Sequence, residues 1–188
     1  MFNMIAAVSQ NGIIGINNGI PWRCKADMQH FKATTMGHVV VMGRKTYDSL
    51  FDFMKDKSGE PLPGRIKYVI SIQPEKVVVR PNVIPISMFP PPTLVAENLM
   101  SRHVDKNIFV IGGAQTYKLF DGCYQDIYLT RINCNYTGER IDDVVHYLPI
   151  TDSVLNRDYE LLYKDSKPSD ADNECSMTFE QWRLRNKF

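Results

Sequence analysis

The 188-residue sequence lacks long apolar runs, a strong net charge and paired cysteine spacings. No apolar run approaches the roughly 20 residues that a membrane-spanning helix needs, so we expect no membrane segment. The formal net charge of +1 argues against nucleic acid or an anionic membrane surface as the main partner. The cysteines, Cys24, Cys123, Cys134 and Cys175, are scattered. We therefore expect free thiols in a reducing cytoplasm rather than zinc ligands or disulfides.

Motifs that mark the common nucleotide-binding loops are also missing. The sequence has no Walker loop, no Gly-x-Gly-x-x-Gly, no internal repeat and no linker-like segment. We therefore expect a single domain over residues 1–188, which is long enough to bury a core. The first residues, Met1–Val8, form a short apolar run without a basic start, which predicts a buried strand rather than a signal peptide.

The stretch Gly19–Lys32 carries the most informative pattern. Pro21 stiffens its start, and a helix is predicted from about Lys25 to residue 36. On that helix Asp27 stands four residues before Phe31, so both lie on one face. A carboxylate among apolar side chains costs free energy unless something hydrogen-bonds it, and water is the simplest partner. The alternative is an ordinary first-turn Asp that faces solvent and offsets the helix dipole.

Residues 9–20, before that helix, mix turn formers with apolar side chains. Three glycines and three asparagines interrupt four isoleucines. Glycine and asparagine favour turns, whereas isoleucines favour burial. This composition is typical of a loop that folds over a pocket, and a hairpin packed permanently on the core is the alternative.

Three further segments favour the binding of anions. A strand over residues 38–42 leads into Gly43, Arg44, Lys45 and Thr46 at a helix start, where free backbone N–H groups and two cations would attract an anion. Arg65 follows the rigid turn Pro61–Gly64 and suits a carboxylate. The strand at 107–111 ends in Gly112 and Gly113, which let a ligand approach the backbone. Taken singly, each cation could instead be solvated.

The remaining segments predict structure rather than chemistry. Residues 51–60 form a charged surface excursion, and Thr93 is expected to cap a helix. Residues 126–132 form a further strand. Residues 159–164 and 177–182 alternate polar and apolar side chains, which predicts an antiparallel hairpin at a sheet edge. The acidic segment 166–174 between them is expected to be mobile.

In order and spacing, these segments resemble the dihydrofolate reductase family from the N-terminus to about residue 138. The resemblance rests on the following segments: Ile5-Ala6-Ala7, Gly15, Gly19-Ile20-Pro21-Trp22, Asp27, Phe31-Lys32, Val41-Met42-Gly43-Arg44-Lys45-Thr46, Leu62-Pro63-Gly64-Arg65, Ile111-Gly112-Gly113, Tyr117 and Tyr128-Leu129-Thr130. It implies a single-domain α/β fold with a mostly parallel, twisted, eight-stranded sheet. An antiparallel C-terminal strand and helices on both faces complete that fold.

The resemblance also implies an activity, the NADPH-dependent reduction of 7,8-dihydrofolate to tetrahydrofolate for one-carbon metabolism. A hydride would pass to C6 of the pterin, and N5 would be protonated. Asp27 would be the pocket carboxylate, Trp22 would help to hold a water molecule, and Thr130 would hydrogen-bond the carboxylate. The implied substrate contacts are Ile5, Asp27, Met28, Phe31, Leu50, Arg65 and Thr130, with Arg65 on the glutamate α-carboxylate.

For the cofactor, the resemblance implies a site for NADPH and no metal. Ala7 would bond the nicotinamide carboxamide through its backbone, while Ile14 and Ile20 would close over the ring. In the family, a hydroxyl residue at the position of Ile72 often contacts the adenosine 2′-phosphate. Here Arg44, Lys45 and Ser71 would make that contact instead. The implied cofactor contacts are Ala7, Ile14, Ile20, Gly43, Arg44, Lys45, Thr46, Ser71, Ile111, Gly112, Gly113, Gln115 and Tyr117.

Two rival functions are open at this point. A reductase of the same fold that acts on a riboflavin-precursor pyrimidine would share the NADPH half, but it leaves Trp22, Asp27 and Arg65 unexplained as a set. A non-catalytic folate- or nucleotide-binding protein would need no proton donor. For the favoured function we expect dihydrofolate and antifolates as the ligands of a cytoplasmic monomer.

Overall fold

The structure is a computed structural model that describes residues 1–53 and 59–185. The strands are β1 (Phe2–Ser9), β2 (Ile13–Ile16), β3 (Val39–Gly43), β4 (Ile66–Ser71), β5 (Val83–Ser87), β6 (Ile108–Gly112), β7 (Asp126–Ile132), β8 (Val145–Tyr147), β9 (Tyr159–Lys167) and β10 (Met177–Leu184). The helices are α1 (Lys25–Thr35), α2 (Arg44–Phe53), α3 (Pro92–Arg102), α4 (Ala114–Leu119), α5 (Asp152–Asp158) and the short 3-10 turn η1 (Pro74–Lys76). The predicted strand and helix positions agree with these elements.

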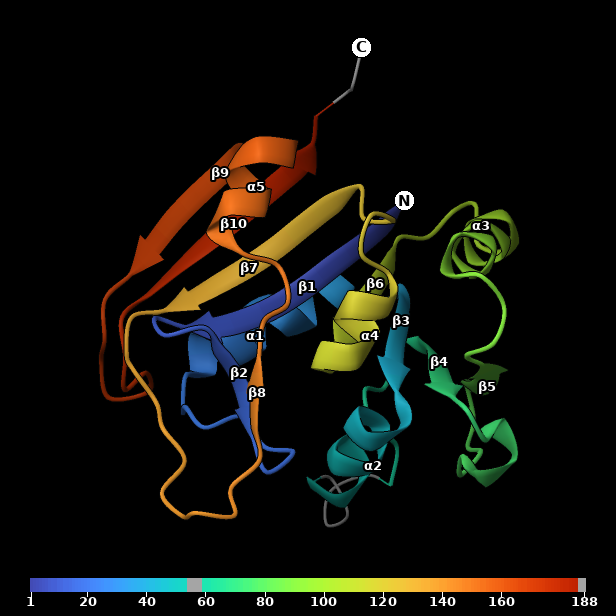
Figure 1. The fold of residues 1–188 in the computed structure, drawn as a ribbon, viewed down its shortest axis with the longest axis horizontal. Coiled ribbons are helices and arrows are strands. Elements are labelled where there is room, and N and C mark those ends of the chain that lie inside the picture. Colours follow the sequence, from blue (N-terminus) through green and yellow to red (C-terminus); the bar gives the residue numbers. More distant parts are fainter. Residues whose placement is uncertain (54–58, 186–188) are drawn as a thin grey trace. The chain divides into compact units, whose positions relative to one another are not determined.

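The main sheet has eight strands in the order β5-β4-β3-β6-β1-β7-β10-β9. β3 runs parallel to β4 and β6, and β4 runs parallel to β5. β10 is antiparallel to both of its neighbours, β7 and β9, which run beside it in Figure 1. The predicted fold class is confirmed. Among the described residues no helix is long and apolar enough to span a membrane.

The chain divides into two compact units. The first comprises Met1–Asn3 and Thr35–Cys123, and the second comprises Met4–Thr34 and the chain from Tyr124 onward. Buried side chains of the first unit form one core cluster, which consists of Val40, Met42, Tyr47, Val69, Val77 and Val83. A core cluster of the second unit, called the Trp22 cluster below, consists of Trp22, Cys24, Ile132, Cys175 and Met177. The expectation of one domain over residues 1–188 stays a prediction.

The loop that precedes α1 is neither a free flap nor a hairpin of its own. Its residues Ile13–Ile16 form β2, which pairs with β8 more than a hundred residues later in the chain. Ile13 on β2 is buried, whereas Ile20 is 55% exposed. Pairing with β8 therefore replaces the predicted hairpin, and closure of the segment over a pocket stays a prediction.

Two local predictions are wrong. Helix α3 begins after Pro91, which makes no side-chain cap, so Thr93 is not the capping residue. Proline suits the first helical turn because its missing N–H would be unpaired there anyway. The segment 166–174 is not a mobile linker, because Asn173 is 2% exposed and hydrogen-bonded to Asp170. Of the excursion at 51–60, residues 51–53 end α2, and residues 54–58 lie outside the described residues.

The prediction of free thiols is wrong for two of the four cysteines. Cys134 and Cys175 form a disulfide with a Cα–Cα distance of 6.1 Å, whereas Cys24 and Cys123 are free. The reason is strand register: Ile132 on β7 lies opposite Met177 on β10, so the next residues along the same ladder bring these two cysteines opposite each other. A separation of 41 residues in the sequence hides this pairing.

Asp126 at the start of β7 is a buried carboxylate that links β7 to β10 in the second unit. Its side chain is fully buried, and Arg183 on β10 donates to both carboxylate oxygens at 2.9 and 2.8 Å. Burial raises the pKa of Asp126, but the hydrogen bonds from Arg183 and Gln181 outweigh this effect and leave the pKa below its usual range. The charged pair therefore stabilises the fold above the pKa of an unfolded Asp, and this stability is lost as the pH falls through the lowered value.

We expect Asp126→Asn to lower the free energy of unfolding at pH 7 by about 1.5–3 kcal/mol, because hydrogen bonds to a buried charge are lost. Urea unfolding followed by circular dichroism measures this. The matched control is Asp105→Asn, which removes only an exposed partner of Lys106 and should change little. Equal stability of Asp126→Asn and wild type at pH 7 contradicts the stabilising role.

Candidate active site

Asp27 is a buried carboxyl group in the first turn of α1. Its residue is 6% exposed, and the Thr130 side chain on β7 hydrogen-bonds to it. Burial raises the pKa of Asp27, while the Thr130 hydroxyl group and the nearby Trp22 indole act in the opposite direction. The solvent-facing alternative is therefore excluded. A carboxyl group with a raised pKa is suited to hold or pass a proton.

Trp22 lies next to this carboxyl group in the same unit. Its indole ring is buried and packs against Tyr136 with ring centroids 5.6 Å apart. The indole lowers the pKa of Asp27, although its Nε1 has no direct hydrogen-bond partner among the described residues. A buried N–H group without a protein partner is the kind of group that binds an ordered water molecule.

The predicted apolar walls differ in their exposure. Ile5 on β1 is buried and Phe31 on α1 is half-buried, whereas Met28 is 51% exposed. Leu50, in the first unit, is half-buried and packs against that unit's core cluster. Their contact with a substrate stays a prediction.

Two strand-to-helix junctions approach each other closely within the first unit. A Cβ atom on Gly43, between β3 and α2, would lie 2.8 Å from Oγ1 of Thr116 on α4. A Cβ atom on Gly113, between β6 and α4, would lie 3.2 Å from Oγ1 of Thr46 on α2. Gly112 has φ +123°, which L side chains rarely adopt, and its peptide bond to Gly113 is cis. A side chain is therefore strongly disfavoured at positions 43 and 112 and would be a tight fit at position 113.

Charged and polar groups surround these junctions. Arg44 makes a half-exposed ion pair with Asp48 at 3.2 Å, and Lys45 is exposed. Ser71 at the end of β4 is buried, and its Oγ accepts a hydrogen bond from Gln73 N. The other predicted cofactor residues of this unit range from buried to exposed: Tyr117 is buried, Ile111 is half-buried and Gln115 is exposed.

Arg65 is a buried cation rather than a solvent-facing one. It is 4% exposed; its Nε donates to Thr35 Oγ1 at 2.8 Å and its Nη1 to the Pro63 carbonyl at 3.0 Å. Burial lowers the pKa of its guanidinium. The sequence indicated Arg65 but missed Thr35, because nothing local signals a contact between residues 30 positions apart.

The structure brings together some of the predicted residues within each unit. In the second unit Trp22, Asp27 and Thr130 meet, and Ala7 packs against the Trp22 cluster. Ile14 is half-buried on β2. In the first unit the segments 43–46 and 112–117 meet. Thr116 was not predicted as part of this junction. The structure identifies it, because its Oγ1 would contact any side chain at position 43.

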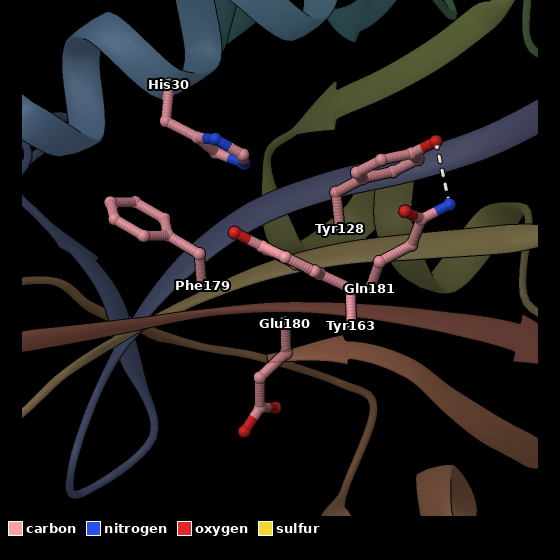
Figure 2. A pocket seen from close by; sticks show the side chains of 6 residues that line it. All are labelled: His30, Tyr128, Tyr163, Phe179, Glu180 and Gln181. Carbon is pink, nitrogen blue, oxygen red and sulfur yellow. Dashed lines mark hydrogen bonds between the residues drawn. The ribbon is translucent and has the colours of Figure 1, made fainter. Parts of the chain in front are cut away.

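A cavity of about 260 Å³ opens in the second unit, and none of the residues predicted to bind substrate or cofactor lines it (Figure 2). Its lining consists of His30, Tyr128, Tyr163, Phe179, Glu180 and Gln181. The His30 ring packs on Phe179 at 4.6 Å, and Gln181 donates to the Tyr128 hydroxyl at 3.1 Å. Glu180 turns its carboxylate away from the rings and binds Arg131. Nothing in this lining pairs an acid with a proton relay, so the candidate site is the one around Asp27.

The comparisons with known proteins identify the family of the chain. The family model for dihydrofolate reductase matches residues 1–184. A type 3 dihydrofolate reductase of Salmonella typhimurium is 31% identical over 179 residues, which cover 95% of each chain. A type 9 enzyme of Escherichia coli is 37% identical over 133 residues, 71% of each chain. The chain belongs to the dihydrofolate reductase family.

A solved structure supports the fold independently. Dihydrofolate reductase from Enterococcus faecalis, complexed with NADP(H) and RAB-propyl, superposes with a TM-score of 0.77 at 20% identity. The match covers 99% of this chain and 97% of that chain. The predicted dihydrofolate reductase fold is therefore confirmed over nearly the whole length.

The burial of Asp27 predicts a cost in stability. Its pKa is raised by burial, so the charge destabilises the fold increasingly as the pH rises from about 3.9, the unfolded value, to the raised folded value, and fully above it. Asp27→Asn should therefore unfold at a higher temperature than wild type at pH 8, and the difference should vanish at pH 3. Calorimetry at both pH values measures this, and a variant that melts lower at pH 8 contradicts the prediction.

Proposed function

We propose that Asp27, Trp22 and Thr130 form the catalytic centre with which this dihydrofolate reductase reduces 7,8-dihydrofolate to 5,6,7,8-tetrahydrofolate. The reaction uses NADPH, adds a hydride to C6 of the pterin and adds a proton at N5. It supplies reduced folate for one-carbon metabolism. The observation that carries the assignment is the buried carboxyl group of Asp27 with its raised pKa and its Thr130 partner.

Asp27 binds and orients the pterin. Its two carboxylate oxygens accept parallel N–H bonds from the amidine-like edge of the ring, which is the geometry of a charge-assisted, bidentate pair. Thr130 holds the carboxylate from behind. The buried indole N–H of Trp22 holds a water molecule that relays a proton toward N5.

The remaining substrate contacts follow the length of dihydrofolate. Ile5, Met28, Phe31 and Leu50 contact the pterin and the benzoyl group. Arg65 pairs with the α-carboxylate of the glutamate tail. Its guanidinium is already held in place by Thr35 and by the Pro63 carbonyl. A preorganised guanidinium loses little side-chain entropy when it binds a carboxylate.

The first unit fits the cofactor where its glycines leave no room for side chains. Gly43 and Gly113 keep backbone N–H groups accessible at two helix starts, and Arg44, Lys45 and Thr46 add charge and a hydroxyl group for the phosphates. When bound, NADPH supplies the hydride. Ser71 contributes to the 2′-phosphate contact. The residues proposed to hold the cofactor elsewhere are Ala7, Ile14, Ile20, Ile111, Gly112, Gln115 and Tyr117.

We also propose that the chain acts as one domain and as a cytoplasmic monomer that binds antifolates at the pterin site. No cluster of three potential metal ligands occurs among the described residues, and none of these steps uses a metal. The alternative of a reductase for a riboflavin-precursor pyrimidine is not favoured by the family match over residues 1–184. Measured oxidation of NADPH with dihydrofolate distinguishes the enzyme from a non-catalytic binding protein.

Replacing the acid tests the catalytic assignment. Asp27→Asn should fold normally yet lose most activity at pH 7, since general acid–base assistance is worth about 10²–10⁴ in rate. Activity should partly recover at low pH, where solvent protonates the substrate. The absorbance of NADPH during turnover measures this, and near-wild-type turnover at pH 7 contradicts the assignment.

Replacing the arginine tests the tail contact. Arg65→Leu should raise the Michaelis constant for dihydrofolate by about tenfold or more, because a charge-assisted bond is lost. Binding of a diaminopyrimidine antifolate without a glutamate tail should stay nearly unchanged. Titration of both ligands into the variant decides the matter: equal losses for the two would show that Arg65 serves the fold rather than the tail.

A further inference from the structure

The first turn of α1, which carries Asp27, is held by a distant turn of the same unit. Lys25 N donates to the Asp172 carbonyl at 3.1 Å, and Ala26 N donates to Asn173 Oδ1 at 2.9 Å. The first N–H groups of a helix have no partner within the helix, so a cap fixes where the helix begins. Here the cap comes from a side chain 147 residues away.

The capping turn is itself rigidly built. Asn173 is 2% exposed, its Nδ2 donates to Asp170 Oδ1 at 2.7 Å, and the same oxygen accepts from Asp172 N at 2.9 Å. Glu174 continues the contact, because its N donates to the Arg23 carbonyl and its Oε1 accepts from Arg23 N. Every residue from Arg23 to Ala26 except Cys24 thus has its backbone N–H bonded to this turn.

The disulfide connects the turn to the second element that holds Asp27. Cys175 follows Glu174 directly, and its partner Cys134 lies four residues after Thr130, the hydrogen-bond partner of Asp27. Cys175 also belongs to the Trp22 cluster, while Cys134 packs against it. The disulfide therefore ties the turn that caps α1 to the chain just after β7, and hydrogen bonds continue the link from the turn to the start of α1.

We propose that Asn173 and the Cys134–Cys175 disulfide are positioning elements for Asp27, so that catalysis responds to the oxidation state of this cysteine pair. The proposal rests on the proposed catalytic role of Asp27. Reduction adds two electrons and two protons to the sulfur–sulfur bond and yields two thiols, while a dithiol reductant closes to its own disulfide. The freed turn then caps α1 less firmly, and Asp27 and Thr130 lose their fixed spacing.

The experiment compares oxidised and dithiothreitol-reduced enzyme, with the thiol count checked by alkylation and mass spectrometry. Reduction should lower kcat/KM for dihydrofolate by about tenfold, since misplacing a catalytic group by a fraction of an ångström has effects of this order. Affinity for NADPH, measured by fluorescence, should not change. Cys134→Ser/Cys175→Ser should show the lowered value with or without reductant, whereas Cys123→Ser should respond as wild type does.

A second pair of variants tests the cap without redox chemistry. Asn173→Ala should lower kcat/KM for dihydrofolate by a similar factor in the oxidised enzyme and leave NADPH affinity unchanged. The matched control, Asp172→Ala, removes only an exposed ion pair with Lys25 and keeps the backbone contact, so it should behave as wild type. An Asn173→Ala variant that melts earlier but retains wild-type kinetic constants would show a structural role alone and overturn the proposal.

Three further outcomes also overturn it: four free thiols after oxidant treatment, identical kinetics of the oxidised and reduced wild type, or an effect of reductant that persists in the double serine variant. Asp27→Asn separates this failure from that of the proposed function. If that variant is inactive and redox state has no effect, only the positioning role is wrong. If it is fully active, the catalytic role of Asp27 is wrong whatever the redox result.

Discussion

The free-energy cost of burying the Asp27 carboxyl group is the constraint on which the contacts around it depend. Removing a carboxylate from water costs free energy, and a Thr130 hydrogen bond recovers only part of it, so the pKa stays raised. A fold that maximised stability would place an apolar residue here. Retaining a buried acid in the first turn of a helix is the kind of local cost that enzymes carry at sites of proton transfer.

The first unit meets a different constraint, which is space. Its two strand-to-helix junctions come so close that a methyl group at position 43 or 113 would meet a threonine hydroxyl group. Such closeness suits the proposed cofactor site, in which backbone N–H groups would bind the phosphates. The two units thus differ in what shapes them: the second unit buries the carboxyl group of Asp27, whereas the first unit has glycines at its two junctions.

The sequence was sufficient for those parts of the molecule in which neighbouring residues determine the outcome. The strands, the helix that begins near Lys25 and the glycine junctions could be predicted because periodicity, turn residues and family spacing are local signals. Contacts between distant residues could not. The pairing of Arg65 with Thr35, and that of β2 with β8, depend on how elements pack. The Thr93 cap failed because Pro91 and Pro92 set the start of α3 instead.

The disulfide was not predicted for the same reason, because its two cysteines are 41 residues apart in the sequence and meet only in the folded chain. Scattered spacing argued for free thiols, yet antiparallel register places Cys134 opposite Cys175. Both cysteines lie just outside the paired segments of β7 and β10, and the bond joins the turn that caps α1 to the chain after β7, at the Trp22 cluster. In a reducing compartment such a bond forms and breaks with conditions. The bond joins the turn that caps α1 to the chain that follows the Thr130 strand, so the spacing of the proposed catalytic pair, Asp27 and Thr130, is the property that its reduction would alter.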